Sequence, residues 1–355
     1  MSAMTLSAKD FRQQMLDWYD RHRRLLPWRA LPNQTSDPYH VWLSEIMLQQ
    51  TTVQAVKAYF EKFLKKWPTV EDMASSSQEA IIDEWAGLGY YARARNLHKC
   101  AKVVADQHKG HFPSDYEELL KLPGIGPYTA AAITSIAFNK PANVVDGNVE
   151  RVMARYMCIE TPFPEGKAEA KEKAALYIGT FEGRHSDYAQ SLMDLGATTC
   201  RPKSPVCGMC PLNKTCCAYS KNLQNELPKR AKKKAPPHKK ATVYIIHNPD
   251  TGEILLERRP ETGLLANTAA FPTSEWLEAE KPLKAKKSQN NVHHVFTHFS
   301  LTLSLKIIKA DENFIFSDKL KRGELQWVSL KEIGKVKFPS LFKKVYRMLP
   351  VDILS

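Results

Sequence analysis

Four cysteines near the middle of the chain have a spacing typical of a metal centre. They are separated by six, two and five residues and stand at Cys200, Cys207, Cys210 and Cys216. Four thiolates in one short loop suit either a 4Fe–4S cluster or a structural zinc ion. Zinc sites usually join two Cys-x-x-Cys pairs across a longer gap, and here only Cys207 and Cys210 form such a pair. The spacing of this loop, residues 200–216, therefore favours one iron–sulfur cluster over zinc.

The remaining cysteines indicate the redox environment. Cys100, Cys158 and Cys217 bring the total to seven, an odd number without the spacing of a disulfide framework, which fits a reducing compartment. The N-terminal residues lack a basic segment followed by an apolar run, and no apolar stretch reaches membrane length. We therefore expect a cytoplasmic protein, associated with the nucleoid if the source is bacterial, without a membrane partner.

Length and charge narrow the class of protein further. A chain of 355 residues is long enough for two domains with a core each. Its 51 lysines and arginines exceed its 38 aspartates and glutamates, which leaves a formal net charge of +13. An excess of this size makes a polyanion such as nucleic acid the leading partner.

The first 220 residues have the pattern of successive helices. Asp37 and Pro38 predict a helix start, with aspartate as the cap and proline in the first turn. Residues 52–67 repeat apolar side chains at helical spacing, so one face of that helix is expected to be buried. Residues 1–220 are therefore predicted to form an all-α domain.

The composition changes between residues 221 and 240, which are rich in lysine and proline and have no apolar period. Such a segment is predicted to be an extended basic linker. Beyond it, apolar residues alternate as in β-strands, with turn residues at 248–252 and a closing helix expected at 340–348. Residues 241–355 are therefore predicted to form an α+β domain.

A glycine-rich turn at residues 122–128, Leu-Pro-Gly-Ile-Gly-Pro-Tyr, joins two of the predicted helices. Gly124 and Gly126 allow a tight hairpin whose backbone N–H groups, next to a helix N-terminus, can hold a phosphate without reading base sequence. Alone, such a turn could equally be a simple helix connection. Its place ahead of the segment Val-Val-Asp-Gly-Asn-Val at 144–149 and of the cysteine loop makes the pattern specific.

With these motifs in this order, the chain resembles the helix-hairpin-helix DNA glycosylases with an iron–sulfur cluster, and among them the MutY-type adenine glycosylases. The segments that carry the resemblance are residues 26–29, 41–51, 87–97, 122–128, 145–148, 194–197 and the four cysteines. The resemblance implies an all-α helix-hairpin-helix glycosylase domain with a 4Fe–4S cluster loop, followed by an α+β MutT/nudix-like domain. It also implies a monomeric enzyme that acts on double-stranded DNA.

Two carboxyl side chains match the catalytic residues of the family. Glu45 lies on a predicted helix beside Trp42, Ile46 and Met47. This apolar setting would raise a carboxyl pKa and keep a proton available near neutrality. By resemblance, Glu45 protonates the departing adenine, and Asp146 stabilises the cation-like sugar or traps it covalently. An ordinary surface glutamate and a helix-capping aspartate are the alternatives for these two positions.

Two further positions accompany these carboxyl groups, Asn148 and Tyr128. Asn148 is predicted to cap the helix that follows Asp146, which would leave Asp146 free for catalysis. Lyase members of the superfamily carry a lysine just after the hairpin, where it forms a Schiff base with the opened sugar. This chain has Tyr128 at that position. We therefore expect excision of the base without efficient strand cleavage.

The resemblance also assigns residues that contact DNA. A base must leave the duplex to be reached, and a side chain must fill its place. Gln50 and Tyr90 match residues that probe the base stack and wedge the opposite base, with Leu88 beside Tyr90. The predicted lining of the adenine pocket comprises Arg24, Trp28 and Gln190, and further DNA contacts are predicted at Thr51, Gly124 and Gly126.

In the second domain, Phe296, Thr297 and His298 match the loop with which the family probes the damaged guanine, and Thr297 keeps the hydroxyl group of that loop. The Arg-Glu-x-x-Glu-Glu signature of nucleotide hydrolases does not occur in residues 241–355, which disfavours phosphohydrolase activity. Ala269 and Ala270 stand where relatives usually carry Trp-Glu, so the packing of this region is in question.

A group of histidines in the same domain raises the possibility of a metal. His293, His294 and His298 lie close together in the sequence. On an alternating strand, however, His294 and His298 share a face while His293 points away. Packing or contact with nucleic acid is therefore favoured over a metal site.

Three functions are compatible with these motifs. The favoured one is a base-excision-repair adenine glycosylase for adenine opposite 8-oxoguanine or guanine, with no strand-cleaving activity. An endonuclease III-like enzyme for oxidised pyrimidines is disfavoured by Tyr128 and by the second domain. A non-catalytic, cluster-bearing DNA-binding or redox-sensing protein is disfavoured because binding alone needs neither Glu45 nor Asp146.

Overall fold

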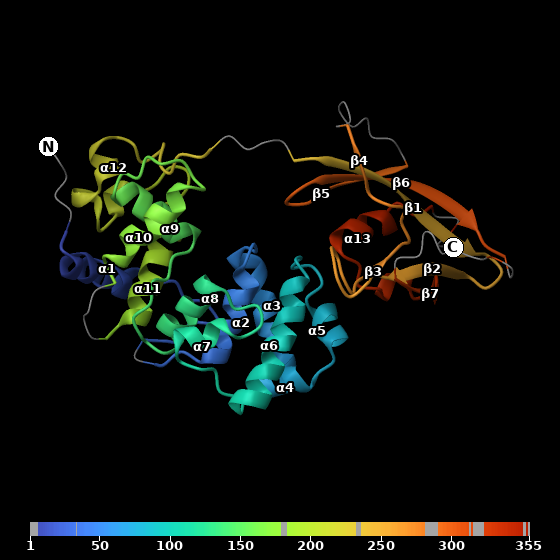
Figure 1. Ribbon diagram of the computed structural model, residues 1–355, viewed down its shortest axis with the longest axis horizontal. Coiled ribbons are helices and arrows are strands. Elements are labelled where there is room, and N and C mark those ends of the chain that lie inside the picture. The colour runs from blue at the N-terminus through green and yellow to red at the C-terminus, as the bar shows by residue number, and fades with distance from the viewer. Residues whose placement is uncertain are drawn as a thin grey trace. The chain divides into compact units, whose positions relative to one another are not determined.

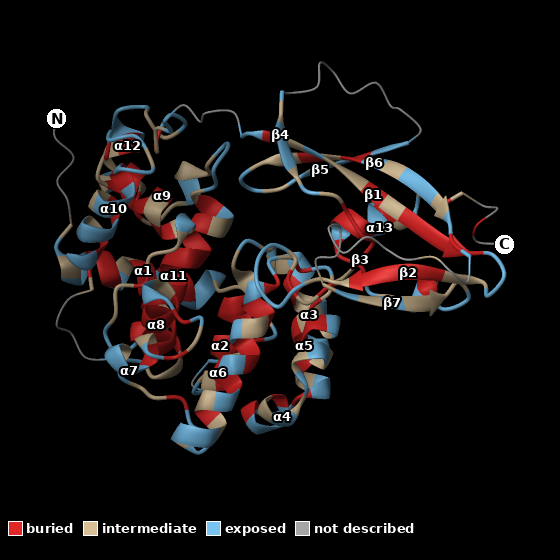
Figure 2. Ribbon diagram, turned by 45° about the vertical axis from the view of Figure 1, so that its right-hand side comes forward, coloured by how far each residue is buried: buried red, intermediate tan, exposed pale blue. Residues whose placement is uncertain are grey.

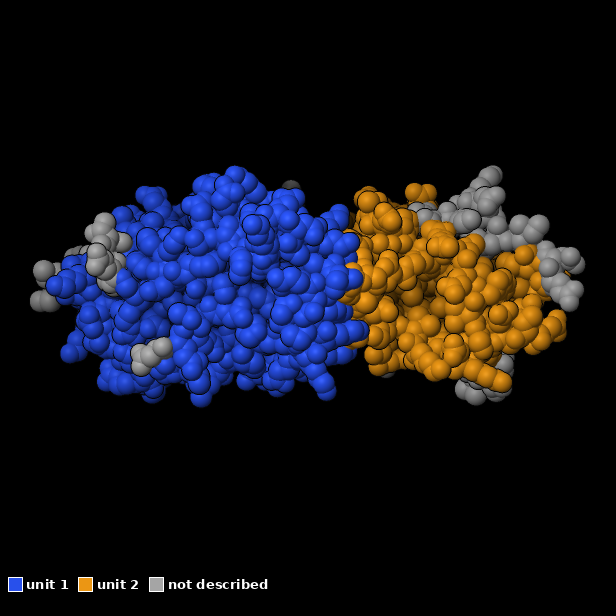
Figure 3. Space-filling view, turned by 90° about the horizontal axis from the view of Figure 1, so that it is seen from below, with its two compact units in different colours: residues 1–75, 96–232 blue, residues 76–95, 233–355 orange. Residues whose placement is uncertain are grey.

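The computed structural model describes residues 6–32, 34–178, 183–231, 236–280, 290–311, 314, 323–350 and 353. The chain divides into two compact units, which Figure 3 colours separately. Unit 1 comprises residues 1–75 and 96–232, and unit 2 comprises residues 76–95 and 233–355. In the described residues, no helix combines the length and the apolar character needed to cross a membrane.

Unit 1 is built from helices joined by short turns (Figure 1). In chain order they are α1 (Ala8–His22), α2 (Pro38–Leu48), α3 (Val53–Lys66), α4 (Val70–Ser75), α6 (Ala92–His108, which begins in unit 2), α7 (Tyr116–Leu120), α8 (Pro127–Ala132), α9 (Gly147–Tyr156), α10 (Gly166–Ala175), α11 (His185–Asp194) and α12 (Cys217–Ser220). The prediction of an all-α first domain is confirmed. Two helices continue as π-helical turns, α8 as η1 (Ile133–Ala137) and α11 as η2 (Leu195–Thr199).

The central helix α2 begins as its sequence predicts. Asp37 caps it by accepting a hydrogen bond of 2.7 Å from the backbone N–H of Tyr39, and Pro38 occupies the first turn. Most of its side chains are buried, as the red segments of α2 in Figure 2 show. A helix that is buried almost all round can carry a polar side chain only into a cavity or a hydrogen bond.

The glycine-rich turn between α7 and α8 has the expected tight geometry. Gly124 has φ of +77°, a conformation that favours glycine. A Cβ atom at this position would also lie only 2.7 Å from the Cβ atom of Asn96. Gly126 then stands as the N-cap of α8, directly before Pro127. Both the backbone conformation and the close packing therefore require glycine at position 124.

Unit 2 contains a mixed β-sheet with a helix packed on it, besides α5 (Gln78–Glu84). The strands are β1 (His238–Asn248), β2 (Glu253–Arg258), β3 (Ala269–Ala270), β4 (Leu277–Ala279), β5 (Asn291–Val295), β6 (Ser300–Lys309) and β7 (Glu324–Ser329). Neighbouring strands follow the order β3-β2-β1-β6-β5, with β7 paired to β2 and β4 paired to β1. The pair β1 and β6 is parallel, and the other pairs are antiparallel.

Apolar side chains of the sheet and of α13 (Ser340–Tyr346) form the core of unit 2. The alanine pair that replaces the usual Trp-Glu belongs to β3, and Ala270 is fully buried in this core. The next residue, Phe271, stacks on Phe338 with ring centroids 5.1 Å apart. Ala270 thus belongs to the core, and Ala269 packs against it.

The segment predicted as a linker, residues 221–240, has defined contacts at both of its described ends. Leu227 is buried, and Phe163 pairs with Arg230 in an isolated parallel bridge of unit 1. Strand β1 begins at His238, inside the predicted linker. Residues 232–235 lie outside the described residues. The domain limits 1–220 and 241–355 stay predictions.

One disulfide joins Cys158, at the end of α9, to Cys217 in α12. The sequence does not indicate this pair, because the odd number of cysteines has no framework spacing. The two residues are 59 positions apart, so only the tertiary fold brings them together. The bond attaches the end of the cysteine loop to the helix that follows Asp146.

Candidate active site and cysteine loop

Unit 1 contains a cavity of about 640 Å³, a size typical of small-ligand sites. It is bordered by α2, by the start of α8, by the turn before α9 and by α11. The residues predicted from sequence that line it are Arg24, Trp28, Glu45, Gln50, Thr51, Tyr128, Asp146, Asn148 and Gln190. Candidates from five separate segments of the sequence thus meet at one site.

Glu45 projects from α2 into this cavity and is only 7% exposed. Burial raises the pKa of Glu45 from its ordinary value of 4.5 to about 7. The hydroxyl of Tyr128 donates a hydrogen bond of 2.8 Å to Glu45 Oε2 and opposes this shift, whereas the charge of Asp146 adds to it. Glu45 is therefore not an ordinary surface residue, and it can carry a proton near neutral pH.

Asp146 is itself the N-cap of α9, so the prediction that Asn148 caps this helix is wrong. The helix begins at Gly147, and Asp146 Oδ1 accepts hydrogen bonds from the backbone N–H groups of Asn148 (2.9 Å) and Val149 (2.8 Å). The side-chain amide of Asn148 donates a third, of 2.7 Å, to Oδ2. Asp146 thus caps the helix and also lines the cavity, so the two functions do not exclude each other.

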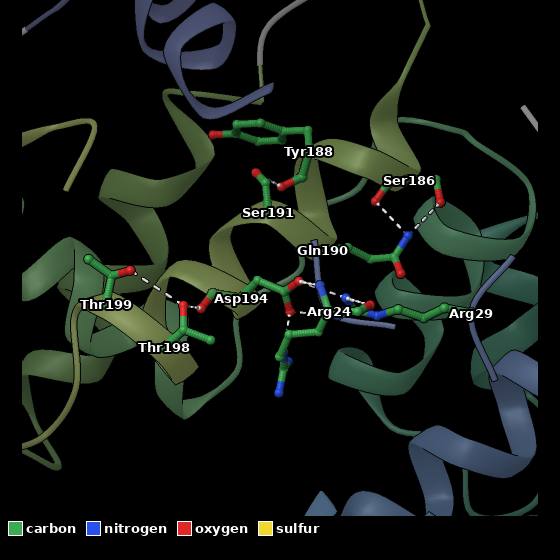
Figure 4. A network of polar contacts seen from close by, with 9 residues as sticks. All are labelled: Arg24, Arg29, Ser186, Tyr188, Gln190, Ser191, Asp194, Thr198 and Thr199. Atoms are coloured by element: carbon green, nitrogen blue, oxygen red, sulfur yellow. Dashed lines mark hydrogen bonds and ion pairs between the residues drawn. The ribbon is translucent and has the colours of Figure 1, made fainter. Parts of the chain in front are cut away.

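A buried ion cluster lies next to the cavity (Figure 4). Asp194 is fully buried and receives two hydrogen bonds from Arg29, of 2.7 and 2.8 Å, and one of 2.6 Å from Arg24 Nε. Burial alone would raise the pKa of Asp194, but Arg29 and Arg24 outweigh it and lower the pKa. The cluster fixes both arginines in place, and it has two positive charges against one negative charge.

Arg29 is a site residue that the sequence analysis did not single out. It lines the cavity with Arg24, and its charge lowers the pKa of Glu45 as the smallest of the identified influences. Its partner Asp194 stands 165 positions away, and no local pattern connects the two. The matching segments at 26–29 and 194–197 contain both residues but do not indicate that they meet.

Gln190 is also held by its surroundings. Its side-chain amide nitrogen lies 3.2 Å from the carbonyl oxygen of Ser186 and 3.1 Å from the hydroxyl of the same residue, as Figure 4 shows. Trp28 lines the cavity while its ring packs edge-on against Phe60, with centroids 5.5 Å apart. Trp28 therefore belongs to the core and to the cavity wall together.

Arg151 connects the Asp146 cap with the cysteine loop. Its guanidinium donates hydrogen bonds to Asn148 Oδ1 (3.0 Å), to the carbonyl of Gly196 in η2 (2.6 Å) and to the carbonyl of Cys200 (2.8 Å). A Cβ atom on Gly196 would lie 2.5 Å from Asn148 Cβ, so η2 and α9 are in close contact. The first cysteine of the loop and the capping aspartate are thus parts of one hydrogen-bonded structure.

The four cysteines of residues 200–216 line one small cavity beside α9. Arg155, one turn beyond Arg151, places Nη1 3.3 Å from Cys200 Sγ. Burial raises the pKa of Cys210 to about 12, and the backbone N–H of Leu212 opposes this shift. The donor set, four sulfurs around one cavity with N–H groups directed at them, fits a thiolate-bound group. In the described ranges, however, no three His, Cys, Asp or Glu side chains are grouped closely enough to hold a metal ion, so the four cysteines share a cavity without forming a single-ion site.

Comparisons with known proteins show the family to which the chain belongs. Residues 43–176 match the model of the HhH-GPD superfamily of base excision DNA repair proteins, and residues 242–348 match the NUDIX domain. An adenine DNA glycosylase of Buchnera aphidicola from Schizaphis graminum is 33% identical over 346 residues, which cover 94% of this chain and 97% of that protein. The chain therefore belongs to the adenine DNA glycosylase family.

Other relatives support this assignment of the enzyme. The human adenine DNA glycosylase is 32% identical and aligns with 95% of this chain and 73% of its own length. The Arabidopsis thaliana adenine DNA glycosylase is 37% identical over 97% of this chain, which spans 56% of that protein. A solved structure of a thermostable thymine-DNA glycosylase is similar to 60% of this chain and 97% of its own, with a TM-score of 0.52 and 33% identity. The predicted family, the two-domain fold and the glycosylase activity are confirmed.

Two residues predicted to probe DNA have an unusual backbone conformation in this glycosylase. Gln50 has φ of +59° and Tyr90 has φ of +49°, a region that residues other than glycine rarely occupy. Both are exposed, Tyr90 by 47%. Leu88, in contrast, is only 6% exposed and packs inside the turn. Gln50 and Tyr90 are thus presented to solvent by constrained turns.

The predicted lesion-reading residues lie in the turn between β5 and β6 of unit 2. The backbone N–H of Phe296 donates a hydrogen bond of 2.8 Å to the carbonyl of Phe299, which closes a tight turn with Thr297 and His298 exposed at its tip. The Phe296 ring packs against Phe299 and Trp276, with centroids 4.7 and 6.0 Å apart. Phe296 therefore anchors the turn, and the polar side chains of Thr297 and His298 are exposed at its tip.

The same unit contains Tyr90, whose hydroxyl is hydrogen-bonded to the hydroxyl of Thr297. The expectation that His294 and His298 share one strand face is wrong, because β5 ends at Val295 and His298 belongs to the turn. His293 instead stacks on the buried His238, with ring centroids 5.8 Å apart.

Proposed function

We propose that the enzyme hydrolyses the N-glycosidic bond of adenine paired with 8-oxoguanine or with guanine in double-stranded DNA. The observation that carries this proposal is the pair of carboxyl groups in one cavity, Glu45 with its pKa raised to about 7 and Asp146 held by three hydrogen bonds. The name shared by the curated relatives, adenine DNA glycosylase, supports adenine as the base removed.

In the proposed reaction, Glu45 is the general acid. Adenine is a poor leaving group until one of its ring nitrogens is protonated, and a carboxyl group with a pKa of about 7 is protonated in roughly half of the molecules at neutral pH. Its position on the buried helix α2 leaves Glu45 only 7% exposed. The Tyr128 hydroxyl donates a hydrogen bond to Oε2 of Glu45 and so fixes the carboxyl group. The other oxygen, Oε1, is then directed at the base.

Asp146 acts on the sugar in this mechanism. As the bond to adenine breaks, positive charge develops on the anomeric carbon and ring oxygen of the deoxyribose. A carboxylate in a fixed orientation stabilises that charge or forms a transient covalent bond with the anomeric carbon. The three donors around Asp146 hold it in one orientation before the substrate arrives. Water then completes the hydrolysis.

The proposed enzyme is monofunctional. A lyase would need an amine at position 128 to form a Schiff base with the opened sugar, and this chain has Tyr128, whose hydroxyl donates a hydrogen bond to Glu45. The expected product is therefore an intact strand with an abasic site. Arg24, Trp28 and Gln190, which line the cavity, are proposed to surround the extruded adenine.

We also propose that Cys200, Cys207, Cys210 and Cys216 bind one 4Fe–4S cluster. When bound, such a cluster would cross-link the loop and present its basic residues to DNA, without a step in the glycosidic chemistry. The four sulfurs around one cavity and the Arg155 guanidinium at Cys200 support this assignment. Iron and sulfide analysis of the purified protein should give about four of each per chain. One zinc ion per chain without visible absorption would overturn the proposal.

Unit 2 is proposed to read the base opposite adenine. The exposed Thr297 and His298 at the tip of the β5–β6 turn supply hydrogen-bonding groups, while Phe296 anchors the turn. A polar contact to a base edge is worth about 1–3 kcal/mol. The variant Thr297→Val, His298→Ala, which keeps Phe296, should therefore lower the preference for 8-oxoguanine over guanine by roughly tenfold. An unchanged preference would remove this turn from the proposal.

The experiment that tests the main proposal is single-turnover excision on three duplexes that differ only in the base opposite adenine: 8-oxoguanine, guanine and thymine. Excision should be fastest opposite 8-oxoguanine, slower opposite guanine and close to absent opposite thymine. Strand breaks should appear only after alkaline treatment of the product. Equal rates on the three duplexes, or breaks without alkali, would contradict the proposed specificity or the proposed monofunctional reaction.

A further inference from the structure

Lys167 lines the same cavity but has no part in the mechanism described above. It is the second residue of α10, and about half of its side chain, 49%, is exposed. Its ammonium group forms an ion pair with Glu150, with Nζ 3.1 Å from Oε1 and 2.8 Å from Oε2. A positively charged group thus stands at the wall of a cavity whose other wall residues include two carboxyl groups.

The position of Lys167 is set by close packing around the start of α10. A Cβ atom on Gly166 would lie only 2.3 Å from the carbonyl oxygen of Thr161, so the helix begins in direct contact with the preceding turn. That turn is held in place by hydrogen bonds between Phe163 and the backbone of Lys229 (2.8 Å) and Ala231 (3.0 Å). Lys167 Nζ also lies 5.9 Å from the centre of the Phe163 ring. The base of the side chain is therefore rigid, and only its charged end can move.

Glu150 places the ammonium group on the side of α9 that carries Asp146. The two acidic residues are four positions apart, so they lie on one face of the helix start. The backbone N–H groups of Asn148 and Val149 are already used by Asp146. This helix N-terminus is therefore not available to bind a phosphate, and Lys167 is the cation that this wall of the cavity offers instead.

A nucleotide whose base enters the cavity brings its backbone phosphate to the rim, where Glu45 and Asp146 provide no attraction for it. We propose that Lys167 binds this phosphate and that Glu150 holds the ammonium group in position until DNA displaces it. The inference rests on the proposed function, because it assumes an extruded nucleotide. Lys167 is then a substrate-positioning residue, since it contacts the backbone and not the reacting atoms.

The competing explanation is an ordinary surface ion pair between α9 and α10, which would add little to stability. The two explanations differ in the effect of Glu150. A structural pair loses the same interaction whichever partner is neutralised, so both changes would act in the same direction. If Lys167 binds phosphate and Glu150 competes for it, the two changes affect DNA binding in opposite directions, because removal of the Glu150 charge frees Lys167 for DNA.

The experiment uses the full chain and a duplex with 2′-fluoro-2′-deoxyadenosine opposite 8-oxoguanine, since the fluorine slows cleavage and allows equilibrium binding to be measured. Lys167→Met keeps an unbranched apolar side chain at this position and removes the charge. Lys173→Met is the matched control, because it lies on the same helix about 120° around the axis from Lys167 and does not line the cavity. Binding is measured between 50 and 200 mM salt, and excision is measured in single-turnover reactions at saturating enzyme.

We expect Lys167→Met to weaken binding by roughly three- to tenfold and to lower the slope of log K against log salt by about one. The excision rate constant at saturation should stay within about twofold of the wild-type value. The Lys167→Arg variant, which keeps the positive charge, should bind DNA as the wild type does. Glu150→Gln should strengthen binding by roughly two- to fivefold. Lys173→Met should leave the salt slope within about 0.3 of the wild-type value.

Equal salt slopes for the Lys167→Met and Lys173→Met variants would overturn the inference, as would weaker binding by the Glu150→Gln variant. A lower rate constant at saturation with unchanged binding would instead assign Lys167 to the chemical step. Failure of the proposed function is a separate result, because the wild-type protein would then not excise adenine at all. Thermal unfolding of each variant identifies any loss of fold, and the Arg and Gln substitutions still decide the question if Lys167→Met is unstable.

Discussion

The α2 wall and the α9 wall of the cavity each present a carboxyl group, in opposite surroundings. On the α2 wall, Glu45 lies among apolar side chains and accepts a hydrogen bond from Tyr128, and burial raises its pKa to about 7. On the α9 wall, Asp146 stands at a helix N-terminus and accepts three hydrogen bonds, two of them from backbone N–H groups. The first environment favours the protonated acid, and the second provides donors suited to an anion.

This difference shows how two carboxyl groups can have different functions in one reaction. Glycosidic hydrolysis needs a proton donor at the leaving base and a fixed negative charge at the sugar. The helix interior supplies the first, because it removes water from Glu45. The helix start supplies the second, because its free N–H groups orient Asp146. Substitutions that change one environment at a time therefore separate the two functions.

The largest effect is expected from Glu45→Gln. Glutamine keeps the shape of the side chain but cannot deliver a proton, so excision of adenine should fall by at least the upper end of the 10²- to 10⁴-fold range typical of general acids. Binding of the duplex with adenine opposite 8-oxoguanine should stay close to the wild-type value. Single-turnover kinetics and equilibrium binding on the same preparation measure both quantities. An excision rate within threefold of the wild-type value would show that the acid is a different residue.

Asp146→Asn tests the other wall. Asparagine is also a good N-cap and can still accept hydrogen bonds from the N–H groups of Asn148 and Val149, so α9 should remain folded. The negative charge beside the sugar is lost, and excision should fall by roughly 10²- to 10³-fold, as for other fixed groups that stabilise a charged transition state. Circular dichroism checks the helix content. A large loss of stability with little loss of excision would mean that Asp146 serves the fold alone.

The sequence predicts the α2 wall better than the α9 wall, for a physical reason. The burial of Glu45 follows from the apolar residues around it in the same helix, so the raised pKa could be expected from local sequence. At α9, both Asp146 and Asn148 are good caps, and which of them lies one residue before the helix depends on packing against η2. The close contact between Gly196 and Asn148 is part of that packing, and it is invisible in either segment alone.

Long-range pairs mark the limit of sequence reasoning elsewhere in the molecule. Arg29 and Asp194 meet across 165 positions, and Cys158 and Cys217 across 59. Neither pair has a local signal, because charge pairing and thiol pairing depend on distance in space. The strands of unit 2, in contrast, follow from alternating apolar residues and a turn at 248–252, and the observed β1 and β2 agree with that pattern.

A stability difference of intermediate size is expected from the same Glu45→Gln change. The pKa of Glu45 in the folded protein, about 7, lies above its ordinary value of 4.5, so the folded chain holds this proton more tightly than the unfolded chain. The stabilising contribution of the bound proton is present below pH 4.5 and is lost as the pH rises through 7. Glutamine has no such loss, so the variant should be more stable than the wild type by roughly 1–3 kcal/mol at pH 8.5.

Urea unfolding at pH 5 and at pH 8.5 measures this difference. The advantage of the Glu45→Gln variant should shrink toward pH 5, where the wild-type carboxyl group is mostly protonated in the folded chain. An advantage of equal size at both pH values would assign it to packing and not to ionisation. A variant less stable than the wild type at pH 8.5 would show that Glu45 is not held in an environment that disfavours its charge.

The smallest expected effect comes from Tyr128→Phe, which removes the hydrogen bond to Glu45 and leaves both carboxyl groups in place. Burial raises the pKa of Glu45, and the hydrogen bond from the Tyr128 hydroxyl opposes that shift, so removal of the hydroxyl should raise the pKa further. Because Glu45 acts in its protonated form, the decline of the single-turnover rate at high pH should move upward by up to about one pH unit. Tyr39→Phe is a matched control, since its hydroxyl donates to the Trp67 carbonyl away from the cavity lining. If the rate instead declines at a lower pH in the Tyr128→Phe variant, the hydroxyl helps to keep Glu45 protonated and does not oppose the rise in its pKa.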